Sequence, residues 1–328
     1  MTTTVGNLHA EFRAFWHPVA WSYEVTTTPM AVTLLAEPLV LVRRSGGGAE
    51  AYFDECPHRG APLSLGRVED DELVCAYHGW RFGSDGKATC IPALGSDATI
   101  PSRACLGKPS AVCERYGIVW VSLETPRVPI PEWPDDDDAS LGRFSPVAHT
   151  SRVLAAYQTD NLLDASHFPF LHVSLSDRNP LIGEQTIVDQ HRFGFSTVQR
   201  KLADDGVSTE GWLRYTCVVP FTVLLRSEEP DGALRQSFFQ AIQPIDQHYT
   251  RLFFIHRVPD TDPAVLAELH AAEEIVQQED LWMTAALRRD GMPLVGAPDL
   301  HVRSDGNAIL YRRVMRNVFE DPQDIAAK

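Results

Sequence analysis

Residues 161–172 read Asn-Leu-Leu-Asp-Ala-Ser-His-Phe-Pro-Phe-Leu-His, and the rest of the chain is organised around this stretch. It holds two histidines, His167 and His172, and a carboxylate, Asp164, three residues before the first histidine. Residues three apart share a helix face, so we expect Asp164 and His167 to point the same way. Pro169 lacks an N–H and disfavours helical geometry at the preceding residue, which predicts a bend that brings His172 back toward His167. Taken alone, two histidines near a carboxylate are more typical of ordinary surface or core residues than of a metal site.

The overall composition indicates a soluble globular protein of more than one domain. The chain has 328 residues, of which 44% are apolar, and a formal charge of −15 from 44 acidic and 29 basic residues. This length exceeds one ordinary domain. An acidic balance argues against nucleic acid or an anionic membrane as the main partner and favours small molecules or a basic protein face.

The cysteine count and the hydropathy pattern predict a cytoplasmic location. No run approaches the roughly twenty apolar residues of a membrane span. The first residues show neither a basic nor an apolar signal region, so we expect no secretory signal. Six cysteines in a chain of this length do not indicate a disulfide framework. Cysteines paired with histidines are therefore better interpreted as metal ligands.

The first part of the chain is predicted to be a small all-β unit. A short helix over residues 8–16 precedes strands that the pattern places at Ala31–Leu35, Leu39–Arg43, Ala51–Phe53, Leu73–Ala76, Trp80–Phe82 and Tyr116–Leu123. Four prolines and the acidic run Asp135–Asp138 then predict a stiff, solvated connection. We place the domain boundary there, giving domains 1–130 and 131–328.

The second part mixes strands and helices. Strands are predicted at Arg152–Tyr157, Thr186–Arg200, Trp212–Leu225, Ser237–Pro244 and Tyr249–Val258, which indicates a long antiparallel sheet. A strong helix follows, with Asp262 as its N-cap and Pro263 at its first position. The expected fold class is α+β, with an all-β first domain and a second domain whose sheet wraps around long helices, of the helix-grip type.

A metal motif lies in the all-β unit. Cys56-Pro-His58 and Cys75-Ala-Tyr-His78 each offer one thiolate and one imidazole, and sixteen residues separate them. Zinc also binds two cysteines and two histidines, but zinc fingers usually group like with like. Alternating ligands favour a [2Fe-2S] cluster whose cysteines bind one iron and whose histidines bind the other. Gly60 and Gly79 would let the backbone approach the sulfides.

This motif, extended as Cys-Pro-His-Arg-Gly-Ala and Cys-Ala-Tyr-His-Gly-Trp, resembles that of the Rieske proteins. Residues 161–172, which follow this Rieske-like motif in the chain, are similar to the mononuclear iron site of Rieske non-haem iron oxygenases. The resemblance is to their catalytic (α) subunits, most of all the dicamba monooxygenase and vanillate O-demethylase type, and it spans nearly the whole chain. It implies that His167 and His172 bind ferrous iron together with a later carboxylate.

The resemblance places that carboxylate in a Glu-Asp pair of a late helix, here Glu279-Asp280. Asp280 shares a helix face with Val276, Met283 and Leu287, so it would point inward, where an unpaired carboxylate needs a cation. The alternatives are a surface acid paired with Arg288 or Arg289, or a ligand role for one of the neighbouring acids, which are Glu279, Glu274 and Glu273.

Two further residues have roles that the resemblance implies. Asp164 would hydrogen-bond His167 and the cluster ligand His78 of a neighbouring subunit, offering a path for electrons. Asn161 matches an asparagine near the iron, although a helix cap is an equally good interpretation.

The implied activity is that of a terminal oxygenase component. O₂ is the cosubstrate, and NAD(P)H-derived electrons come from an external reductase or ferredoxin, since this chain shows no flavin, nicotinamide or plant-type ferredoxin motif. The first choice is monooxygenation with O- or N-demethylation of a small aromatic or heterocyclic substrate by a homotrimer. The alternatives are hydroxylation without demethylation and a Rieske electron carrier fused to a ligand-binding domain. Apolar residues expected to form the pocket are Phe170, Leu175, Phe221, Leu224, Phe239, Ile242, Met283 and Leu287.

Overall fold

The computed structural model describes residues 4–95, 99–172, 179–287, 290–295 and 299–320. Its contacts divide the chain into two units, one formed by Arg13–Pro129 and one by Met1–Phe12 together with Ile130–Lys328. The N-terminal residues thus group with the larger unit. As folding domains, the ranges 1–130 and 131–328 stay a prediction.

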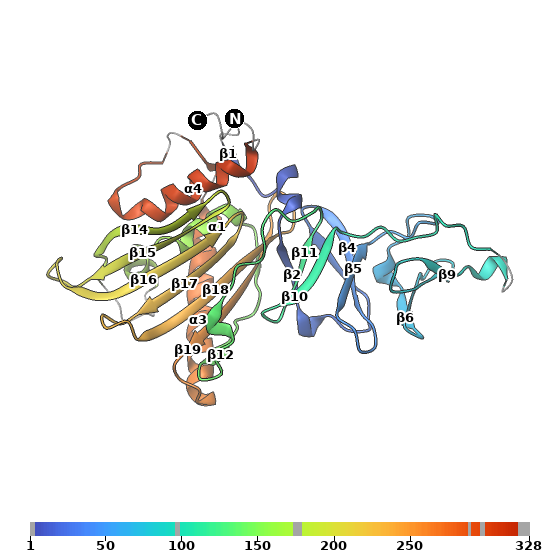
Figure 1. Cartoon of the computed structure of the whole chain (residues 1–328), viewed down its shortest axis with the longest axis horizontal. Helices are drawn as coiled ribbons and strands as arrows, with labels where there is room; N and C mark the ends of the chain where they lie inside the picture. Colours follow the sequence, from blue (N-terminus) through green and yellow to red (C-terminus); the bar gives the residue numbers. More distant parts are fainter. Residues whose placement is uncertain (1–3, 96–98, 173–178, 288–289, 296–298, 321–328) are drawn as a thin grey trace. The chain divides into compact units, whose positions relative to one another are not determined.

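The smaller unit is built from three antiparallel sheets (Figure 1). Their strand orders are β10-β11-β2, β3-β4-β5 and β6-β7-β8-β9. The strands are β2 (His17–Trp21), β3 (Met30–Leu34), β4 (Glu37–Arg43), β5 (Ala49–Phe53), β6 (Arg67–Glu69), β7 (Glu72–Val74), β8 (Arg81–Phe82), β9 (Ala88–Cys90), β10 (Ala111–Arg115) and β11 (Ile118–Ser122). The expected all-β unit is confirmed. The expected opening helix is only a short 3-10 turn, Ala10–Ala14.

The core of this unit reaches the loops that carry the metal motif. Val40 and Val42 of β4 pack with Leu73 and Phe82, and the same cluster of buried residues contains Cys56 and Cys75. Both cysteines therefore project from loops anchored in the hydrophobic core, so the spacing between their sulfur atoms is held by packing.

An eight-stranded antiparallel sheet forms the larger unit, with the order β12-β19-β18-β17-β16-β15-β14 and β13 also paired to β19. Its strands are β12 (Gly142–Phe144), β13 (Thr150–Ser151), β14 (Ile182–His191), β15 (Gly194–Leu202), β16 (Thr209–Val218), β17 (Thr222–Glu228), β18 (Leu234–Pro244) and β19 (Thr250–Val258). The helices are α1 (Ala155–Leu162), α2 (Phe168–Leu171), α3 (Pro263–Ala286) and α4 (Gly306–Phe319), and β1 (Thr4–Val5) pairs with β20 (Met292–Pro293). The expected α+β fold is confirmed.

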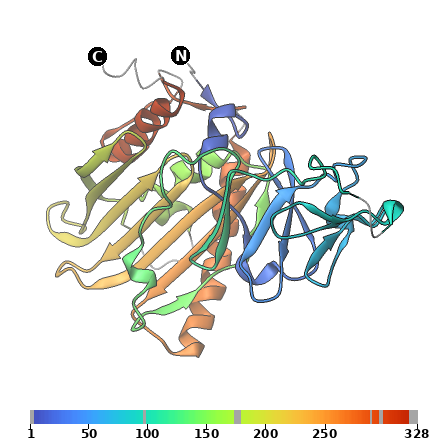
Figure 2. The same cartoon turned by 45° about the vertical axis from the view of Figure 1, so that its right-hand side comes forward.

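One face of the large sheet carries the helices (Figures 1 and 2). Thr197 of β15 donates to Asn307 of α4 at 2.8 Å, Gln240 of β18 donates to the Gln158 carbonyl of α1 at 3.3 Å, and His256 of β19 lies 3.5 Å from Glu273 of α3. Successive side chains of a strand alternate between the two faces of a sheet, so the buried residues of the helix face recur at every second position.

The start of α3 follows its sequence signals. The Asp262 side chain accepts a hydrogen bond from the Ala264 N–H at 2.8 Å, and Pro263 occupies the first helical position. The predicted N-cap is confirmed, and α3 runs on to Ala286.

Three strand predictions are wrong. Arg152–Tyr157 does not form a strand, because α1 begins at Ala155, whose N–H donates to the side chain of Asn7 at 2.8 Å. That cap comes from a residue far away in the sequence, so no local pattern reports it. Thr186–Arg200 is not one strand either, since the chain turns at residues 192–193 between β14 and β15. Trp212–Leu225 is likewise divided, by a turn at residues 219–221 between β16 and β17.

The acidic run is not simply a solvated connection. Asp135, whose side chain is 15% exposed, pairs with Arg226, and Arg257 donates to the carbonyl oxygens of Asp135, Asp136 and Asp138. Trp133 donates to Ser237 at 2.8 Å, on the opposite face of the sheet from the helices. Arg226 thus neutralises one acid of the run and Arg257 anchors its backbone, while Asp137 and Asp138 remain exposed.

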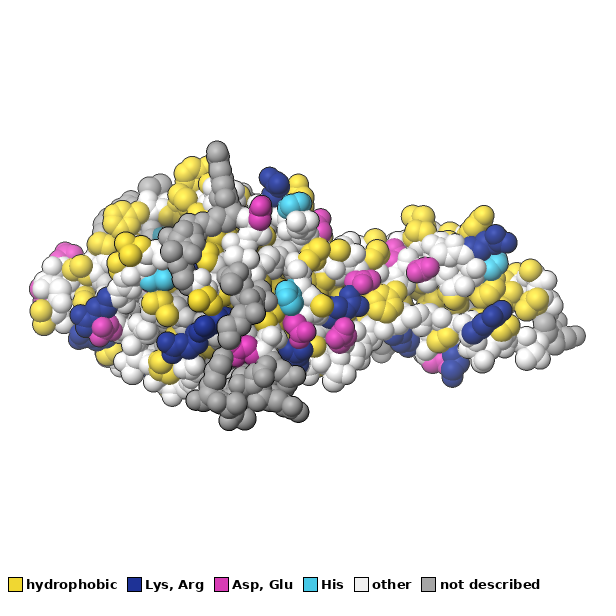
Figure 3. Space-filling view, turned by 90° about the horizontal axis from the view of Figure 1, so that it is seen from above, with side chains coloured by type: hydrophobic (Ala, Val, Ile, Leu, Met, Phe, Trp, Pro, Cys, Tyr) yellow, Lys and Arg dark blue, Asp and Glu magenta, His cyan; other side chains and the backbone are white. Residues whose placement is uncertain are grey.

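Within the described residues, no helix is long and apolar enough to cross a membrane. On the molecular face drawn in Figure 3, acidic and basic side chains are interspersed and form no single large patch of one sign.

Candidate metal centres

The two loops of the Cys/His motif share one backbone design. The Cys56 N–H donates to the Ala61 carbonyl and the Gly60 N–H to the Cys56 carbonyl, both at 2.9 Å. In the second loop the Cys75 N–H donates to the Trp80 carbonyl at 2.9 Å and the Gly79 N–H to the Cys75 carbonyl at 3.0 Å.

Each loop turns back at its glycine, where φ is +70° at Gly60 and +69° at Gly79. Side-chain-bearing residues rarely adopt this conformation, which explains the glycine at both places. The paired loops bring the rings of His58 and His78 to a centroid distance of 4.4 Å, edge to face.

Two side chains of these loops, Cys56 and His58, have shifted pKa values. Burial, with Cys75 beside it, raises the pKa of Cys56 to about 11, so its thiol ionises at neutral pH only if a metal takes the proton's place. Burial and the neighbouring His78 lower the pKa of His58, which keeps its imidazole neutral as a ligand must be. The buried Nδ1 of His58 has no hydrogen-bond partner among the described residues. Two thiols and two imidazoles on matched loops fit the donor set of a Rieske [2Fe-2S] cluster.

The second candidate centre starts at the end of α1. Asp164 and His167 do not share a helix, as the sequence analysis expected, because both lie in the turn between α1 and α2. Asp164 Oδ1 accepts hydrogen bonds from the Ser166 N–H and hydroxyl, which fixes the turn, and its other oxygen lies 3.7 Å from His167 Nδ1.

Pro169 also acts differently from the expectation. It lies in the first turn of the short helix α2, where its missing N–H costs no hydrogen bond. The expected return of His172 toward His167 is nevertheless observed. The single turn of α2 returns His172 to His167, and the two Nε2 atoms lie 3.2 Å apart.

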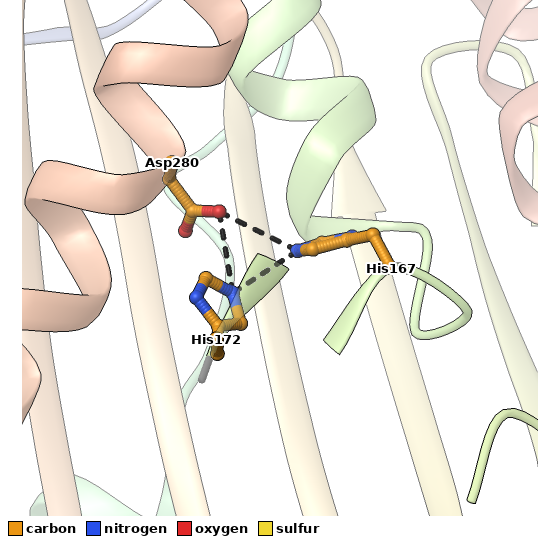
Figure 4. A group of neighbouring side chains, drawn as sticks. All are labelled: His167, His172 and Asp280. Carbon is orange, nitrogen blue, oxygen red and sulfur yellow. Dashed lines mark hydrogen bonds and ion pairs between the residues drawn. The ribbon is translucent and has the colours of Figure 1, made fainter. Parts of the chain in front are cut away.

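Asp280 of α3 completes a triangle of donor atoms (Figure 4). Its Oδ1 lies 3.4 Å from His167 Nε2 and 3.3 Å from His172 Nε2, and it has no hydrogen-bond partner among the described residues although it is buried. A metal with bonds of about 2.1 Å needs donor atoms roughly 3.0–3.4 Å apart, so the triangle fits one ion. Two imidazoles and a carboxylate bind non-haem iron and also zinc, so the donor types alone do not choose the metal.

The pKa values of His167 and Asp280 shift in opposite directions, so the buried triangle favours a positive charge beside the Asp280 carboxylate. Burial disfavours the charged form of His167, yet Asp164 and Asp280 outweigh it and raise the His167 pKa to about 9. Burial likewise disfavours ionisation of Asp280, but the two histidines lower its pKa. An ionised, nearly buried carboxylate facing two imidazoles is a site where a divalent cation replaces protons.

The neighbouring acids of α3 have other partners. Glu279 Oε2 lies 3.0 Å from His172 Nδ1, the ring nitrogen that faces away from the triangle. Glu274 accepts from the Val147 N–H and lies 2.7 Å from His149 Nε2, while Glu273 faces His256. Asp280 is therefore the only one of the four acids whose oxygen joins both Nε2 atoms. The alternative partners Arg288 and Arg289 lie outside the described residues.

Asn161 lies within the last turn of α1, so it is not an N-cap. Its carbonyl accepts the Asp164 N–H at 3.2 Å.

The expected pocket residues do not form one set. Leu224, Phe239 and Ile242 are buried in the sheet, with Leu224 and Phe239 paired on neighbouring strands, and Phe221 is buried in the turn before β17. In contrast, Phe170 is 72% exposed and Met283 is exposed as well. Leu287 lines a hollow of about 280 Å³ with Tyr157 and Thr284, but the walls of that hollow do not include the triangle. Leu175 lies outside the described residues.

Gln277 is a polar residue that the sequence analysis missed. It is 2% exposed on the buried face of α3 with Leu281 and Thr284, and neither amide atom has a hydrogen-bond partner among the described residues. It precedes Asp280 by three positions, close to one helical turn. Only a census of buried hydrogen-bonding groups reveals it, because glutamine on a helix is unremarkable in sequence.

Known proteins resemble this chain over both units. The family described as Rieske [2Fe-2S] domain matches residues 15–106, and the family described as vanillate O-demethylase oxygenase C-terminal domain matches residues 153–321. Methylxanthine N1-demethylase NdmA of Pseudomonas putida is 30% identical over 94% of this chain and 89% of its own length.

Solved structures agree. NdmA with caffeine superposes with a TM-score of 0.78 at 28% identity, covering 93% of this chain and 90% of that one. Dicamba monooxygenase bound to dicamba gives a TM-score of 0.78 at 20% identity over 97% and 99% of the two chains, which supports the fold alone.

Proposed function

This chain belongs to the Rieske non-haem iron oxygenases, as the catalytic (α) subunit of the terminal oxygenase component, and from that premise we propose that it demethylates a small N- or O-methylated ring compound. Members of the family use a Rieske [2Fe-2S] cluster, mononuclear iron and O₂, and they take electrons from an external reductase or ferredoxin. The observation that carries the proposal is the convergence of two Nε2 atoms and one Oδ1 atom in a chain similar to a methylxanthine N1-demethylase.

We assign the ligands from the geometry. Cys56, His58, Cys75 and His78 hold the cluster, and His167, His172 and Asp280 hold the mononuclear iron. When bound, the two groups together supply electrons and activate O₂ for insertion into a C–H bond. The buried Oδ1 of Asp280, which has no hydrogen-bond partner within the described residues, supports this assignment.

The side chains around the iron site then act by positioning. Asp164 is held in place by Ser166 and sets a carboxylate oxygen 3.7 Å behind the rear nitrogen of His167, an ion-pair distance that favours the charged imidazole without a direct hydrogen bond. Asn161 supports Asp164 through its carbonyl oxygen.

Hydroxylation of a methyl group on nitrogen or oxygen gives a hemiaminal or hemiacetal. This product releases formaldehyde, and the balance is one substrate, one O₂, two electrons and two protons to demethylated substrate, formaldehyde and water. The names of the relatives favour demethylation over hydroxylation that retains the methyl carbon.

Gln277 favours a heterocycle among the candidate substrates. Its buried amide lacks partners among the described residues, lies three positions before Asp280 on α3, and offers an NH₂ donor group and a carbonyl acceptor. A ring that carries a carbonyl and a ring nitrogen would satisfy both, whereas a hydrocarbon would leave them unpaired, at a cost of about 1–3 kcal/mol for each group.

We propose a homotrimer in which each cluster serves the iron of the next subunit. The support is the family resemblance together with the place of Asp164, whose carboxylate backs His167 at the edge of the site while its side chain stays one-third exposed. A cytoplasmic location is also proposed, because none of the six cysteines, all within the described residues, forms a disulfide.

A substrate panel tests the reaction. Methylxanthines, other N-methyl heterocycles and methoxybenzoates are supplied with a surrogate reductase, and formaldehyde release is compared with O₂ uptake. We expect equal amounts of both for at least one N-methyl heterocycle. Substrate-dependent O₂ uptake with a hydroxylated product that retains its methyl carbon would instead establish hydroxylation.

A further inference from the structure

His172 is held from both sides by adjacent residues of one helix. Its Nε2 lies 3.3 Å from Asp280 Oδ1 and its Nδ1 lies 3.0 Å from Glu279 Oε2. The ring is almost completely buried, with 2% of the side chain exposed. Adjacent residues on a helix point in different directions, so the longer side chain of Glu279 is needed to reach the far nitrogen.

We propose that Glu279 is the positioning residue of the iron site: its carboxylate accepts the Nδ1–H of His172 and so presents the Nε2 lone pair to the metal. This inference rests on the proposed iron ligands and adds a residue to them. A neutral imidazole carries one proton, and the hydrogen bond made by one nitrogen decides which nitrogen is free to bind metal.

The two histidines are supported unequally, which makes Glu279 specific to His172. The nearest carboxylate oxygen to His167 Nδ1 belongs to Asp164 at 3.7 Å, beyond hydrogen-bond length, and Asp164 also binds Ser166. Glu279 is closer to its histidine and lies on the helix that carries the third ligand. Because Glu279 and Asp280 are adjacent on α3, any shift of this helix moves both carboxylates relative to His172.

Charge explains why a glutamate is suited to this position. An anion behind an imidazole makes the opposite nitrogen a better electron donor and offsets part of the charge of a bound dication. A glutamine keeps a carbonyl oxygen that can accept the same hydrogen bond but loses the charge. An alanine loses both. The proposal therefore predicts graded effects rather than one uniform loss.

The test compares Glu279→Gln and Glu279→Ala with Glu268→Gln, a control at an exposed position of the same helix. Ferrous iron affinity is measured by titration of enzyme that retains its cluster. We expect the dissociation constant to rise about tenfold in Glu279→Gln and about a hundredfold in Glu279→Ala, with no change in the control. The visible absorption of the cluster verifies that each variant is folded.

A spectroscopic signature separates positioning from general damage. In cobalt(II)-substituted enzyme, the Nδ1–H of each ligand histidine gives a hyperfine-shifted, exchangeable proton signal. We expect two such signals in the native protein and in the control, with the His172 signal selectively lost by rapid exchange in Glu279→Ala and retained in Glu279→Gln.

Two results would overturn the proposal. One is an iron affinity and a pair of proton signals in Glu279→Ala that match the control. The other is complete loss of metal from both Glu279 variants, as expected only of a direct ligand. The ligand assignment has its own test, because if His167→Ala and Asp280→Ala both keep tight iron binding, the proposed site itself is wrong, whatever Glu279 does.

Discussion

The Nε2 atoms of His167 and His172 lie 3.2 Å apart, although each ring could have turned away from the other. Two neutral imidazoles gain little from such an approach unless a proton or a metal ion lies between them. Asp280 Oδ1 lies within 3.4 Å of both nitrogens, which makes the site suitable for a divalent cation.

We predict that His58→Ala and Cys75→Ser each abolish the cluster absorption and all NAD(P)H-driven turnover. A Rieske cluster needs both thiolates and both imidazoles, and no other described cysteine or histidine lies in the two loops to replace them. Visible spectroscopy together with iron and sulfide analysis measures the loss. A normal spectrum in either variant would contradict the assignment.

The trimer prediction uses complementation between two inactive variants, His78→Ala and His167→Ala. In a random mixture about three quarters of the trimers contain both types, each with one junction where an intact cluster faces an intact iron site, so roughly a quarter of full activity should return. Each variant must first be shown to fold and assemble. A mixture that assembles but stays inactive would place electron transfer within a single chain.

Sequence patterns predicted which side chains come together better than they predicted what holds those side chains in place. The periodicity of α3 placed Asp280 inward correctly, but Met283, assigned to the same face, is exposed, and the buried stripe runs through Gln277, Leu281 and Thr284. Glu279 was interpreted only as a substitute ligand, because its reach around the His172 ring depends on the position of a helix about a hundred residues away in the chain.

Distant contacts that sequence patterns do not predict also hold the start of α1 and the acidic run Asp135–Asp138. Asn7 caps α1 at Ala155, and Arg226 pairs with Asp135 of the acidic run. Asn7 and Arg226 are both far in the sequence from the residues that they contact. Local rules report turns, caps and periodicity, whereas these contacts arise only from tertiary packing.

An acid-dependent prediction concerns the smaller unit. Glu114 accepts hydrogen bonds from Arg43 and the Ala49 N–H, and the Arg43 hydrogen bond lowers the pKa of Glu114 to about 2 despite partial burial. A carboxyl whose pKa is depressed by folding stabilises the protein above its unfolded pKa, and that contribution is lost as the pH falls from about 4.5 toward 2.

The measurement compares the native protein with Glu114→Gln by chemical denaturation, monitored through tryptophan fluorescence, to which the buried Trp120 contributes. Because the pair is partly exposed and screened, we expect the native protein to be more stable by about 1 kcal/mol at pH 7 and the difference to shrink by pH 3. A difference that stays constant over this range would contradict the ion-pair account.

Gln277→Leu should separate stability from substrate recognition. Its amide lacks hydrogen-bond partners among the described residues, so removing it should leave the unfolding midpoint unchanged or raised. The KM for an N-methyl heterocycle should rise about five- to tenfold with little change in kcat, because a hydrogen bond made equally in ground and transition states is lost. A clear loss of stability with an unchanged KM would assign Gln277 to the core.

The central claim is that oxidation occurs at His167, His172 and Asp280, and a single turnover tests it most directly. Native protein and Asp280→Ala are reduced and then separated from the excess reductant. Each is mixed with O₂ and an N-methyl substrate that the native enzyme demethylates, and the formaldehyde formed per chain is measured. We predict formaldehyde from the native protein and none from Asp280→Ala, with the cluster absorption the same in both. Equal formaldehyde from the two proteins would show that the reaction takes place elsewhere.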